Sequence, residues 1–467
     1  MEHIKKRPSF HFGRKRTDVD MTEGNIAKHL IQFAFPLLIG NIFQQLYNMV
    51  DTWVVGNYVG DTAFSAVGTV GPIINTLIGF FIGLSTGAGV VISQYYGAKQ
   101  MDKVKDTVHT ALTMTFVLGV LFTALGIIFT PFMLRIMKMP PSVAPEATSY
   151  LIIYFAGVMG LMVYNIGSGI LRAVGDSKRP FYFLMVSALL NTVLDLVFVL
   201  VFHMGVEGVA YATIIAQGVS ATLVIITLCR THSVVRVSLR SLCIHFDMLK
   251  KIFRIGLPAA IQTAITAFSN VFAQSYINYF EVNHPGCMGG WTAYSKIDQL
   301  LFMPMQSLAL ASTTFVGQNL GIGKVDRAKR GIRIALTFSL SCSAWLMIPV
   351  IAFAPHLVTF FNSEPGVIQY GTLFLRLITP FYLLSSFNQI YAGALRGAGN
   401  SRAPMVIMLL SFVAFRQVYL FVMANYISNT IIPIAMGYPA GWLLCSILTT
   451  TYFYRVKLDK NRIVEDN

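Results

Sequence analysis

The chain has 467 residues, of which 55% are hydrophobic and 12% are charged, and it carries a formal net charge of +15. A soluble domain has about 25% charged residues, so this composition excludes an ordinary soluble protein and predicts an all-α polytopic membrane protein. No residues have the spacing of a nucleophile with its base or of a set of metal ligands, so we expect neither an enzyme nor a bound metal or cofactor.

Twelve apolar segments, each long enough to cross a bilayer, follow one another along the chain. We place them at 28–55, 63–94, 108–133, 147–173, 180–203, 207–229, 252–280, 291–319, 332–355, 368–393, 404–427 and 431–454. They divide the protein into an N-terminal tail (1–27), a first six-helix lobe (28–229), a linker (230–251), a second six-helix lobe (252–454) and a C-terminal tail (455–467).

Basic residues occupy one side of this predicted arrangement. Lys and Arg concentrate in both tails, in the linker and in alternate loops, whereas the loops on the other side hold only Arg135 and Lys138. Positively charged loops stay in the cytoplasm, so we expect a multi-pass protein of the cell membrane with both termini cytoplasmic. The net charge thus reflects topology, and no nucleic-acid partner is expected.

The first segment contains a carboxylate within an apolar stretch. Asp51 follows Asn41, Gln44 and Asn48 at spacings of three, four and three residues, which is one face of a helix. Pro36, near the start of the segment, predicts a helix kink. An acid at the centre of a membrane helix costs about 2.5–3.5 kcal/mol, so an acid there indicates a function such as ion binding. The alternative is that Asp51 lies at the external interface, where a carboxylate costs little.

The fifth segment contains a second carboxylate, Asp195, one helical turn after Asn191. Both this segment and the first run from the inside to the outside, and both acids fall in the outer half of the bilayer. The sequence therefore predicts that Asp51 and Asp195 act at a similar depth.

The second half of the chain repeats the first. The stretch LRAVGDSKRP at 171–180 returns as LRGAGNSRAP at 395–404, and SQYYGAKQMDKVKD at 93–106 returns as GQNLGIGKVDRAKR at 317–330. Because each half has an even number of segments, the two copies point the same way across the membrane. The second copy has Ala273 and Tyr419 where the first has Asp51 and Asp195, so the role of the acids belongs to the first lobe.

The second lobe has its own charges inside segments. Asp298 lies beside Lys296, and we expect a structural ion pair with Lys296 or with a basic residue of another helix, such as Arg416. Arg376 and Arg416 have no acidic residue in their own segments, so each is either structural or binds an anionic group.

In their order and duplication, these motifs resemble the multidrug and toxic compound extrusion (MATE) family. The resemblance rests on FPLLIGNIFQQLYNMVDTWVVGNYVG, GFFIGLSTGAGVVISQYYGA, the paired LRAVGDSKRP and LRGAGNSRAP loops, and LLNTVLDLVF, and it covers about residues 21–455. It implies two lobes that form a V around a central cavity, an export cycle driven by a proton or sodium gradient, and the branch of the family whose key acids lie in the N-terminal lobe.

The family pattern also implies a proton or cation site in the first lobe, at Asp51, Asn165, Ser168, Asn191, Asp195 and Thr213. Ser168 stands where some members have an amide, and we favour protons over sodium as the coupling ion. The partners that we expect are small-molecule substrates and the lipid bilayer, with the protein acting as a monomer.

The expected substrate cavity combines amide, hydroxyl, aromatic and thioether groups. Such surfaces adapt to varied hydrophobic ligands, and aromatic faces attract cations. We expect its lining to include Gln44, Tyr47, Asn48, Gln262, Thr266, Asn270, Gln274, Tyr294 and Met303.

Two other functions compete with a cation-coupled exporter. A flippase for lipids or lipid-linked sugars, of the related superfamily, would use basic residues in the cavity, and Arg376, Arg416 and Lys296 are candidates. A membrane scaffold or receptor explains neither the duplicated halves nor the buried acids. The pair of acids in the first lobe favours the exporter.

Overall fold

The computed structural model describes residues 18–137 and 139–464, and within these ranges it contains helices and no strands. Its first half contains α1 (Ile26–Val54), α2 (Asp61–Gly97), α3 (Met101–Ile136), α4 (Ala144–Ala156), α5 (Val158–Ala173), α6 (Lys178–Leu196) and α7 (Gly205–Arg230). The second half contains α8 (Phe246–Asn278), α9 (Cys287–Gly321), α10 (Val325–Ala352), α11 (Ala354–Phe361), α12 (Pro365–Ile378), α13 (Tyr382–Gly397), α14 (Arg402–Leu409), α15 (Arg416–Val422), α16 (Ile431–Ala435) and α17 (Gly437–Arg455).

The described chain has 11 helical segments that are long and apolar enough to cross a membrane, and a twelfth if the bent pair α4 and α5 counts as one. This pair bends by 46° at Gly157, where a Cβ atom would stand 2.3 Å from the side chain of Ile214 on α7. The prediction of an all-α polytopic protein is thus confirmed.

Several helices extend beyond the apolar segments predicted from the sequence. α3, for example, begins at Met101 and not near residue 108. Its first two turns carry the polar residues Asp102, Lys103 and Lys105, so the apolar segment predicted from the sequence did not include them. α1 runs without a break through Pro36, and its change of winding comes later, in a π-helical turn at Val55–Val59. The helix is therefore continuous at Pro36, the position of the expected kink.

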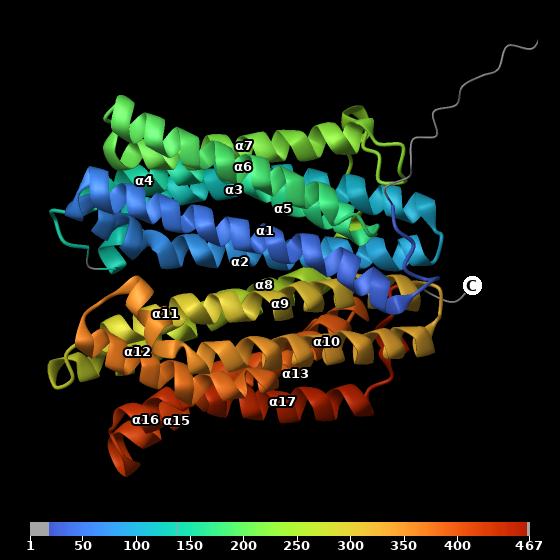
Figure 1. Cartoon of the computed structure of the whole chain (residues 1–467). Coiled ribbons are helices and arrows are strands. Elements are labelled where there is room, and N and C mark those ends of the chain that lie inside the picture. Colours follow the sequence, from blue (N-terminus) through green and yellow to red (C-terminus); the bar gives the residue numbers. More distant parts are fainter. Residues whose placement is uncertain (1–17, 138, 465–467) are drawn as a thin grey trace, which may run out of the picture.

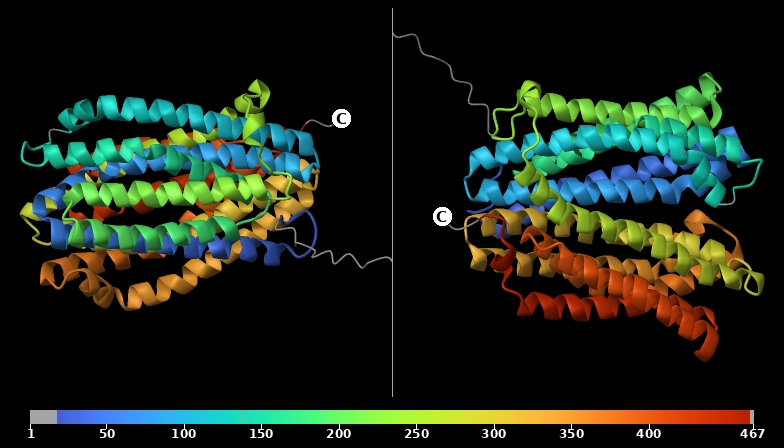
Figure 2. Two further views of the ribbon diagram at one scale, coloured as in Figure 1. Left: turned by 90° about the horizontal axis from the view of Figure 1, so that it is seen from above. Right: turned by 180° about the vertical axis from the view of Figure 1, so that it is seen from behind.

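The helices pack in two groups, α1–α7 and α8–α17, which lie on either side of a common interface (Figure 1). In the first group α2 and α7 pack against α5, and α1 packs against α6; in the second, α10, α12 and α13 surround α9. The interface is formed mainly by α2 against α8 and α9, and by α1 against α9. Seen from behind, α2 and α8 lie side by side (Figure 2).

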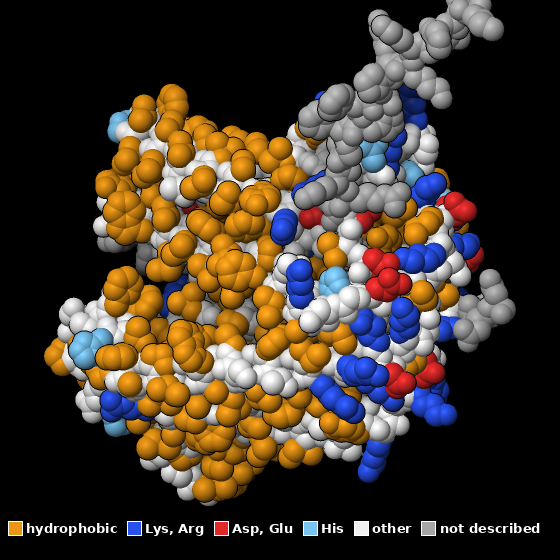
Figure 3. Space-filling view, turned by 45° about the vertical axis from the view of Figure 1, so that its right-hand side comes forward, with side chains coloured by type: hydrophobic (Ala, Val, Ile, Leu, Met, Phe, Trp, Pro, Cys, Tyr) orange, Lys and Arg blue, Asp and Glu red, His pale blue; other side chains and the backbone are white. Residues whose placement is uncertain are grey.

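Both ends of the described chain lie at the same end of the bundle, which we call the termini end (Figure 1). Lys and Arg side chains gather there, and the molecule is hollowed between its two halves at the opposite end, which we call the open end (Figure 3). The positions of the basic residues thus agree with the charge pattern of the sequence.

Two repeat-related glycines bring the lobes into contact at the termini end. A Cβ atom on Gly97 would stand 1.9 Å from the carbonyl oxygen of Gln318, and one on Gly321 would stand 2.0 Å from that of Gln94. No side chain fits at either position, so glycine is required for this close approach.

The glutamines at this contact make matching hydrogen bonds. Gln94 Nε2 donates to the carbonyl of Gly397 (2.8 Å), and Gln318 Nε2 donates to that of Ala173 (3.0 Å). Each side-chain oxygen accepts from a backbone N–H of a terminal segment, that of Ile463 for Gln94 (2.7 Å) and that of Met21 for Gln318 (2.9 Å). Both side chains are fully buried. We call Gln94 and Gln318 the glutamine pair.

Candidate ion and substrate site

Asp51 and Asp195 come together because two parallel helices share a register. α1 and α6 run in the same direction and touch where Gly40 lies against Leu184. Eleven residues farther on, α1 has reached Asp51 and α6 has reached Asp195, which is the same rise along both helices. The two carboxyl groups interact, and they are near enough to share a hydrogen bond when one of them carries a proton.

A π-helical turn follows each acid. Val55–Val59 continues α1 one turn after Asp51, and Val197–Val201 begins two residues after Asp195 at the end of α6. Such turns are uncommon and occur frequently at functional sites, where they change the direction of neighbouring side chains. Both acid-bearing helices therefore change their winding on the open-end side of the pair.

Polar atoms around the acids are buried without protein partners. Asp195 and Asn191 are 0% and 2% exposed. Within the described residues no hydrogen bond reaches either oxygen of Asp195, Oδ1 of Asp51, the side-chain amide of Asn191 or the hydroxyl of Thr213. Ser187 fixes α6 against α7 by donating to a backbone carbonyl (2.8 Å) one turn from Thr213. Buried polar groups of this kind ordinarily bind water, a proton or an ion.

Ser168 lies apart from this group. α5 and α7 run side by side in the same direction, with Gly167 packed against Val224. Val224 is eleven residues beyond Thr213 on α7, or roughly 16 Å along the helix. Ser168 is therefore displaced from the acids toward the termini end, and the set expected from the resemblance is divided.

Asn165 lies one turn before Ser168 and is committed to neighbouring backbone. Its side-chain Nδ2 donates to the backbone carbonyl of Leu161 (2.9 Å), and its backbone carbonyl accepts from the hydroxyl of Ser85 of α2 (2.6 Å). The acids are thus left with Asn191 and Thr213 as the nearest of the expected partners.

Two tyrosines beside the acids were missed by the sequence reasoning. Tyr150 and Tyr154 of α4 are buried and stacked, with ring centroids 6.4 Å apart. Tyr150 is close enough to interact with both Asp51 and Asp195, and Tyr154 interacts with Tyr47 of α1. Their spacing of four residues within an apolar segment was the available signal.

At the start of its polar stripe, α1 contacts the second lobe. Gln45 Nε2 donates to Gln299 Oε1 of α9 (2.8 Å), and Asn41 Nδ2 donates to Ser307 (3.4 Å). The expected cavity residues of α1 accompany this stripe: Gln44 and Tyr47 are half-buried and Asn48 is exposed.

The expected cavity residues of the second lobe have different environments. On α8, Gln262 and Thr266 are half-buried, whereas Asn270 and Gln274 are exposed. On α9, Tyr294 and Met303 are buried at 2% and 8% exposure, so they belong to the packing of the lobe and not to an open wall.

Asp298 has no cationic partner among the described residues, and the expected ion pair is not formed. Its carboxylate accepts hydrogen bonds from the hydroxyls of Tyr294 (3.2 Å) and Tyr382. Lys296 is exposed and does not face Asp298, because positions two residues apart on a helix point in different directions. Tyrosine hydroxyls thus satisfy this acid.

The two arginines of the second lobe also differ from each other. Arg416 is 3% exposed; it donates to Ser269 (2.9 Å) and Asn270 (2.8 Å), and its guanidinium lies 4.7 Å from the ring centroid of Tyr438. Arg376 is exposed, and its Nε donates to the carbonyl of Ile351 at 3.4 Å.

Residues 36–197 and 258–422 match the sequence model of the family described as MatE. The two matched ranges correspond to the two halves of the repeat.

Relatives and solved structures agree with this match. The chain is 29% identical to the Probable multidrug resistance protein YpnP of Bacillus subtilis, over 93% of this chain and 96% of the relative, and 30% identical to YoeA of the same organism, also a probable multidrug resistance protein, over 90% and 92%. Its fold superposes with a TM-score of 0.88 on a structure described as the outward-facing conformation of a multidrug resistance MATE family transporter, at 23% identity over 94% of this chain and 98% of that chain.

Proposed function

Because the chain belongs to the MatE family, the multidrug and toxic compound extrusion transporters, we propose that it is a secondary active antiporter that exports organic, often cationic or amphipathic compounds. The proposal places it in the cell membrane as a monomer, with the termini end in the cytoplasm and the open end outside. The positive-inside distribution of Lys and Arg supports this orientation.

The observation that carries the proposal is the pairing of Asp51 with Asp195 inside the first lobe. The buried Asp195 and the half-buried Asp51, whose carboxyl groups interact and have no cationic partner among the described residues, form a site suited to a positive ion or a proton. The equivalent positions of the second lobe support a specific role, since Ala273 is buried and apolar and the hydroxyl of Tyr419 donates to the carbonyl of Pro433 (3.1 Å).

In the proposed cycle, ion and substrate favour different conformations. The acids take up the coupling ion from the open end, the first lobe changes shape at the π-helical turns beyond them, and substrate leaves. A ligand shifts such an equilibrium only through its different affinity for the two states. Ion binding and substrate binding must therefore oppose each other.

Protons fit the site better than sodium. The displacement of Ser168 leaves few oxygen ligands beside the two carboxyl groups, whereas a shared proton needs only the pair itself. We therefore propose proton coupling, with sodium as the alternative.

Efflux of a cationic dye from cells tests the role of the acids. Asp51→Asn and Asp195→Asn are each expected to lower efflux at least tenfold at unchanged membrane abundance, because an amide neither takes up nor releases a proton. Asp102→Asn, at an exposed acid in the first turn of α3, is the matched control and should leave efflux unchanged. Efflux near that of the unmodified protein in both site variants would refute the proposal.

Reconstituted vesicles with a single imposed gradient test the coupling ion. We expect a pH gradient alone to drive dye transport and a sodium gradient alone to leave it unchanged. The opposite result would replace protons by sodium at the same site.

The flippase is the second candidate, and the burial of Arg416 without an acidic partner in the described chain is the observation that favours it. Three side chains already engage this guanidinium, those of Ser269, Asn270 and Tyr438, which leaves fewer donors for a ligand. Transport of a fluorescent lipid between leaflets, lost in Arg416→Gln and retained in Asp51→Asn, would favour the flippase.

A further inference from the structure

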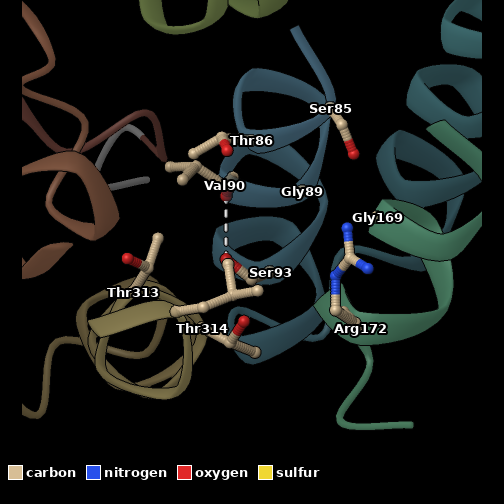
Figure 4. A pocket seen from close by; sticks show the side chains of 10 residues that line it. Ser85, Thr86, Gly89, Val90, Ser93, Gly169, Arg172, Thr313 and Thr314 are labelled. Atoms are coloured by element: carbon tan, nitrogen blue, oxygen red, sulfur yellow. Dashed lines mark hydrogen bonds between the residues drawn. The ribbon is translucent and has the colours of Figure 1, made fainter. Parts of the chain in front are cut away.

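A small pocket lies between the lobes (Figure 4). Ser93 and Arg172 of its lining are close to the ends of α2 and α5 at the termini end, so the pocket is nearer to that end than the acid pair is. It is lined by Ser85, Thr86, Gly89, Val90 and Ser93 of α2, Gly169 and Arg172 of α5, and Leu310, Thr313 and Thr314 of α9. Walls from both lobes therefore enclose it, and with the lobes in contact it has room for about one water molecule.

Arg172 is the charged residue of this pocket. No carboxylate of the described chain pairs with its guanidinium, and no hydrogen bond joins it to another described residue. The nearby acid Asp176 pairs instead with Arg179 (3.3 Å). Arg172 thus brings a positive charge into the pocket without an internal counter-charge.

The direction of the Arg172 side chain is opposite to that of a structural arginine at a membrane boundary. Long basic side chains near helix ends extend toward the aqueous interface. α5 ends at Ala173, yet the guanidinium of Arg172 turns back along α2 toward the level of Ser85 and Gly169, away from the termini end (Figure 4). The protein therefore holds this charge inside, between the lobes.

The hydroxyl groups around Arg172 complete a polar lining. Ser93 and Thr313 donate to backbone carbonyls, of Val90 (3.0 Å) and of Ala309 (2.9 Å), so their oxygens remain as acceptors. The hydroxyl of Thr314 has no hydrogen-bond partner among the described residues, although Thr314 is only 6% exposed. Arg172 and Thr314 consequently offer unused donors from opposite lobes.

We propose that the Arg172 pocket binds the anionic oxygen group, a carboxylate or phosphate, of compounds that enter from the termini end when the lobes part there. A guanidinium is suited to such groups because its N–H donors match two oxygens at once. The pocket widens when its α9 wall moves away from α2 and α5, and it becomes part of the cavity from which substrate is loaded. The inference rests on the proposed export function, and it extends the substrate class to compounds that carry an acid group.

A pair of dyes that differ only in one acid group provides the test. Rhodamine 6G is an ester and a cation, and rhodamine 19 is the corresponding free carboxylic acid. We expect the unmodified protein to export both and Arg172→Gln to export the acid at least tenfold more slowly, with export of the ester within twofold of normal. Arg172→Lys should retain part of the acid export because the charge remains.

Two further variants separate binding from folding. Arg396→Gln changes the repeat-related arginine, which does not line this pocket, and should leave the ratio of acid to ester export unchanged. Thr314→Val preserves the shape of its side chain and should lower the ratio to a smaller extent than Arg172→Gln. An unchanged ratio in Arg172→Gln, or an equal loss of both dyes at normal abundance, would overturn the proposal.

Equilibrium binding to the purified protein in nanodiscs gives a readout that does not depend on transport. Fluorescence polarisation should show tighter binding of rhodamine 19 than of rhodamine 6G, and Arg172→Gln should remove the difference. Inorganic phosphate should displace the acid and not the ester. Phosphate binding that requires Arg172, without any preference for the acid dye, would assign the pocket to a free anion and overturn the role in substrate binding. If the unmodified protein exports neither dye but still binds rhodamine 19 more tightly than rhodamine 6G, the export function alone is refuted.

Discussion

Asp51 and Asp195 meet because of where α1 and α6 touch, and one contact sets the register for both. Gly40 lets α6 approach at Leu184, and the equal number of residues from this contact to each acid brings the carboxyl groups to one level. A shift by one residue in either helix would rotate its acid by about 100° and separate the pair. The position of the site thus depends on packing some 16 Å away from it along the helix.

Side chains near the acids should matter more than those displaced from them. We expect Asn191→Ala to lower dye efflux at least fivefold, because it removes the buried amide beside Asp195. Ser168→Ala should stay within twofold of normal, since Ser168 is roughly 16 Å along the bundle from Thr213. Efflux in membrane vesicles at matched abundance gives both values; a larger loss in Ser168→Ala than in Asn191→Ala would contradict the register derived from the helix contacts.

Asp20, which lies before the first helix, makes the attachment of the N-terminal segment sensitive to pH. Partial burial by itself would raise its pKa, but hydrogen bonds from Lys99 and Thr22 outweigh burial and lower the pKa to about 2 from 3.8. Because the folded-state pKa is lowered, the contribution of Asp20 is complete above its ordinary pKa and is lost as the pH falls from about 4 to about 2.

Fluorescence anisotropy of a label at Val19→Cys, in a cysteine-free protein, measures this attachment. The anisotropy should fall between pH 4 and pH 2, and in Asp20→Asn it should be lower from the start and lose this transition. The same titration curve with and without Asp20 would contradict the assignment.

At the scale of helices, the glutamine pair joins elements that are distant in sequence. Gln94 at the end of α2 bonds to the last residue of α13 and to the C-terminal segment, and Gln318 at the end of α9 bonds to the last residue of α5 and to the N-terminal segment. Four helices and both tails therefore depend on two side chains. Removing either leaves a buried N–H and a buried carbonyl without partners, at about 1–3 kcal/mol for each group.

Loss of the glutamine pair should open the termini end. Spin labels at Asp102→Cys and Asp326→Cys, on exposed first turns of α3 and α10, report the distance between the lobes by pulsed electron paramagnetic resonance. Gln94→Ala and Gln318→Ala should each add a population at longer distance, and the double variant should enlarge it. Gln369→Ala, at an exposed glutamine of α12, serves as the control. Unchanged distances in the double variant would show that the pair does not hold the lobes together.

The elements were largely predictable from the sequence, whereas their contacts were not. Hydropathy located the membrane segments and the repeat located the two copies, but polar first turns such as that of α3 fell outside any hydropathy criterion. The acids were recognisable because charge is costly in a bilayer. The tyrosines beside them and the tyrosine partners of Asp298 were not, since sequence spacing does not reveal which helices touch.

At the scale of the whole molecule, the proposed orientation in the membrane rests on the basic residues of the termini end. In a cysteine-free background, cysteines at Val282 and Asn362 should react with an impermeant reagent added to intact cells, and those at Asp102 and Asp326 should not. All four positions are exposed, so accessibility of the side chain itself does not distinguish them. The native Cys243 is also exposed and lies in the linker, so a variant that retains it as its single cysteine gives a control that should stay unlabelled. Labelling of Asp102→Cys, Asp326→Cys or Cys243 in intact cells would reverse the orientation.

The glutamine pair also has a consequence for how the protein is made. Gln94 leaves the ribosome long before its partner Ile463, and Met21 leaves it long before its partner Gln318 of the second lobe. A ribosome must therefore complete α9 before the N-terminal segment is fastened to Gln318, and it must pass Ile463 before the C-terminal segment is fastened to Gln94. Until then the side-chain oxygen of Gln94 lacks this backbone N–H, and it stays without it in a product truncated before Ile463.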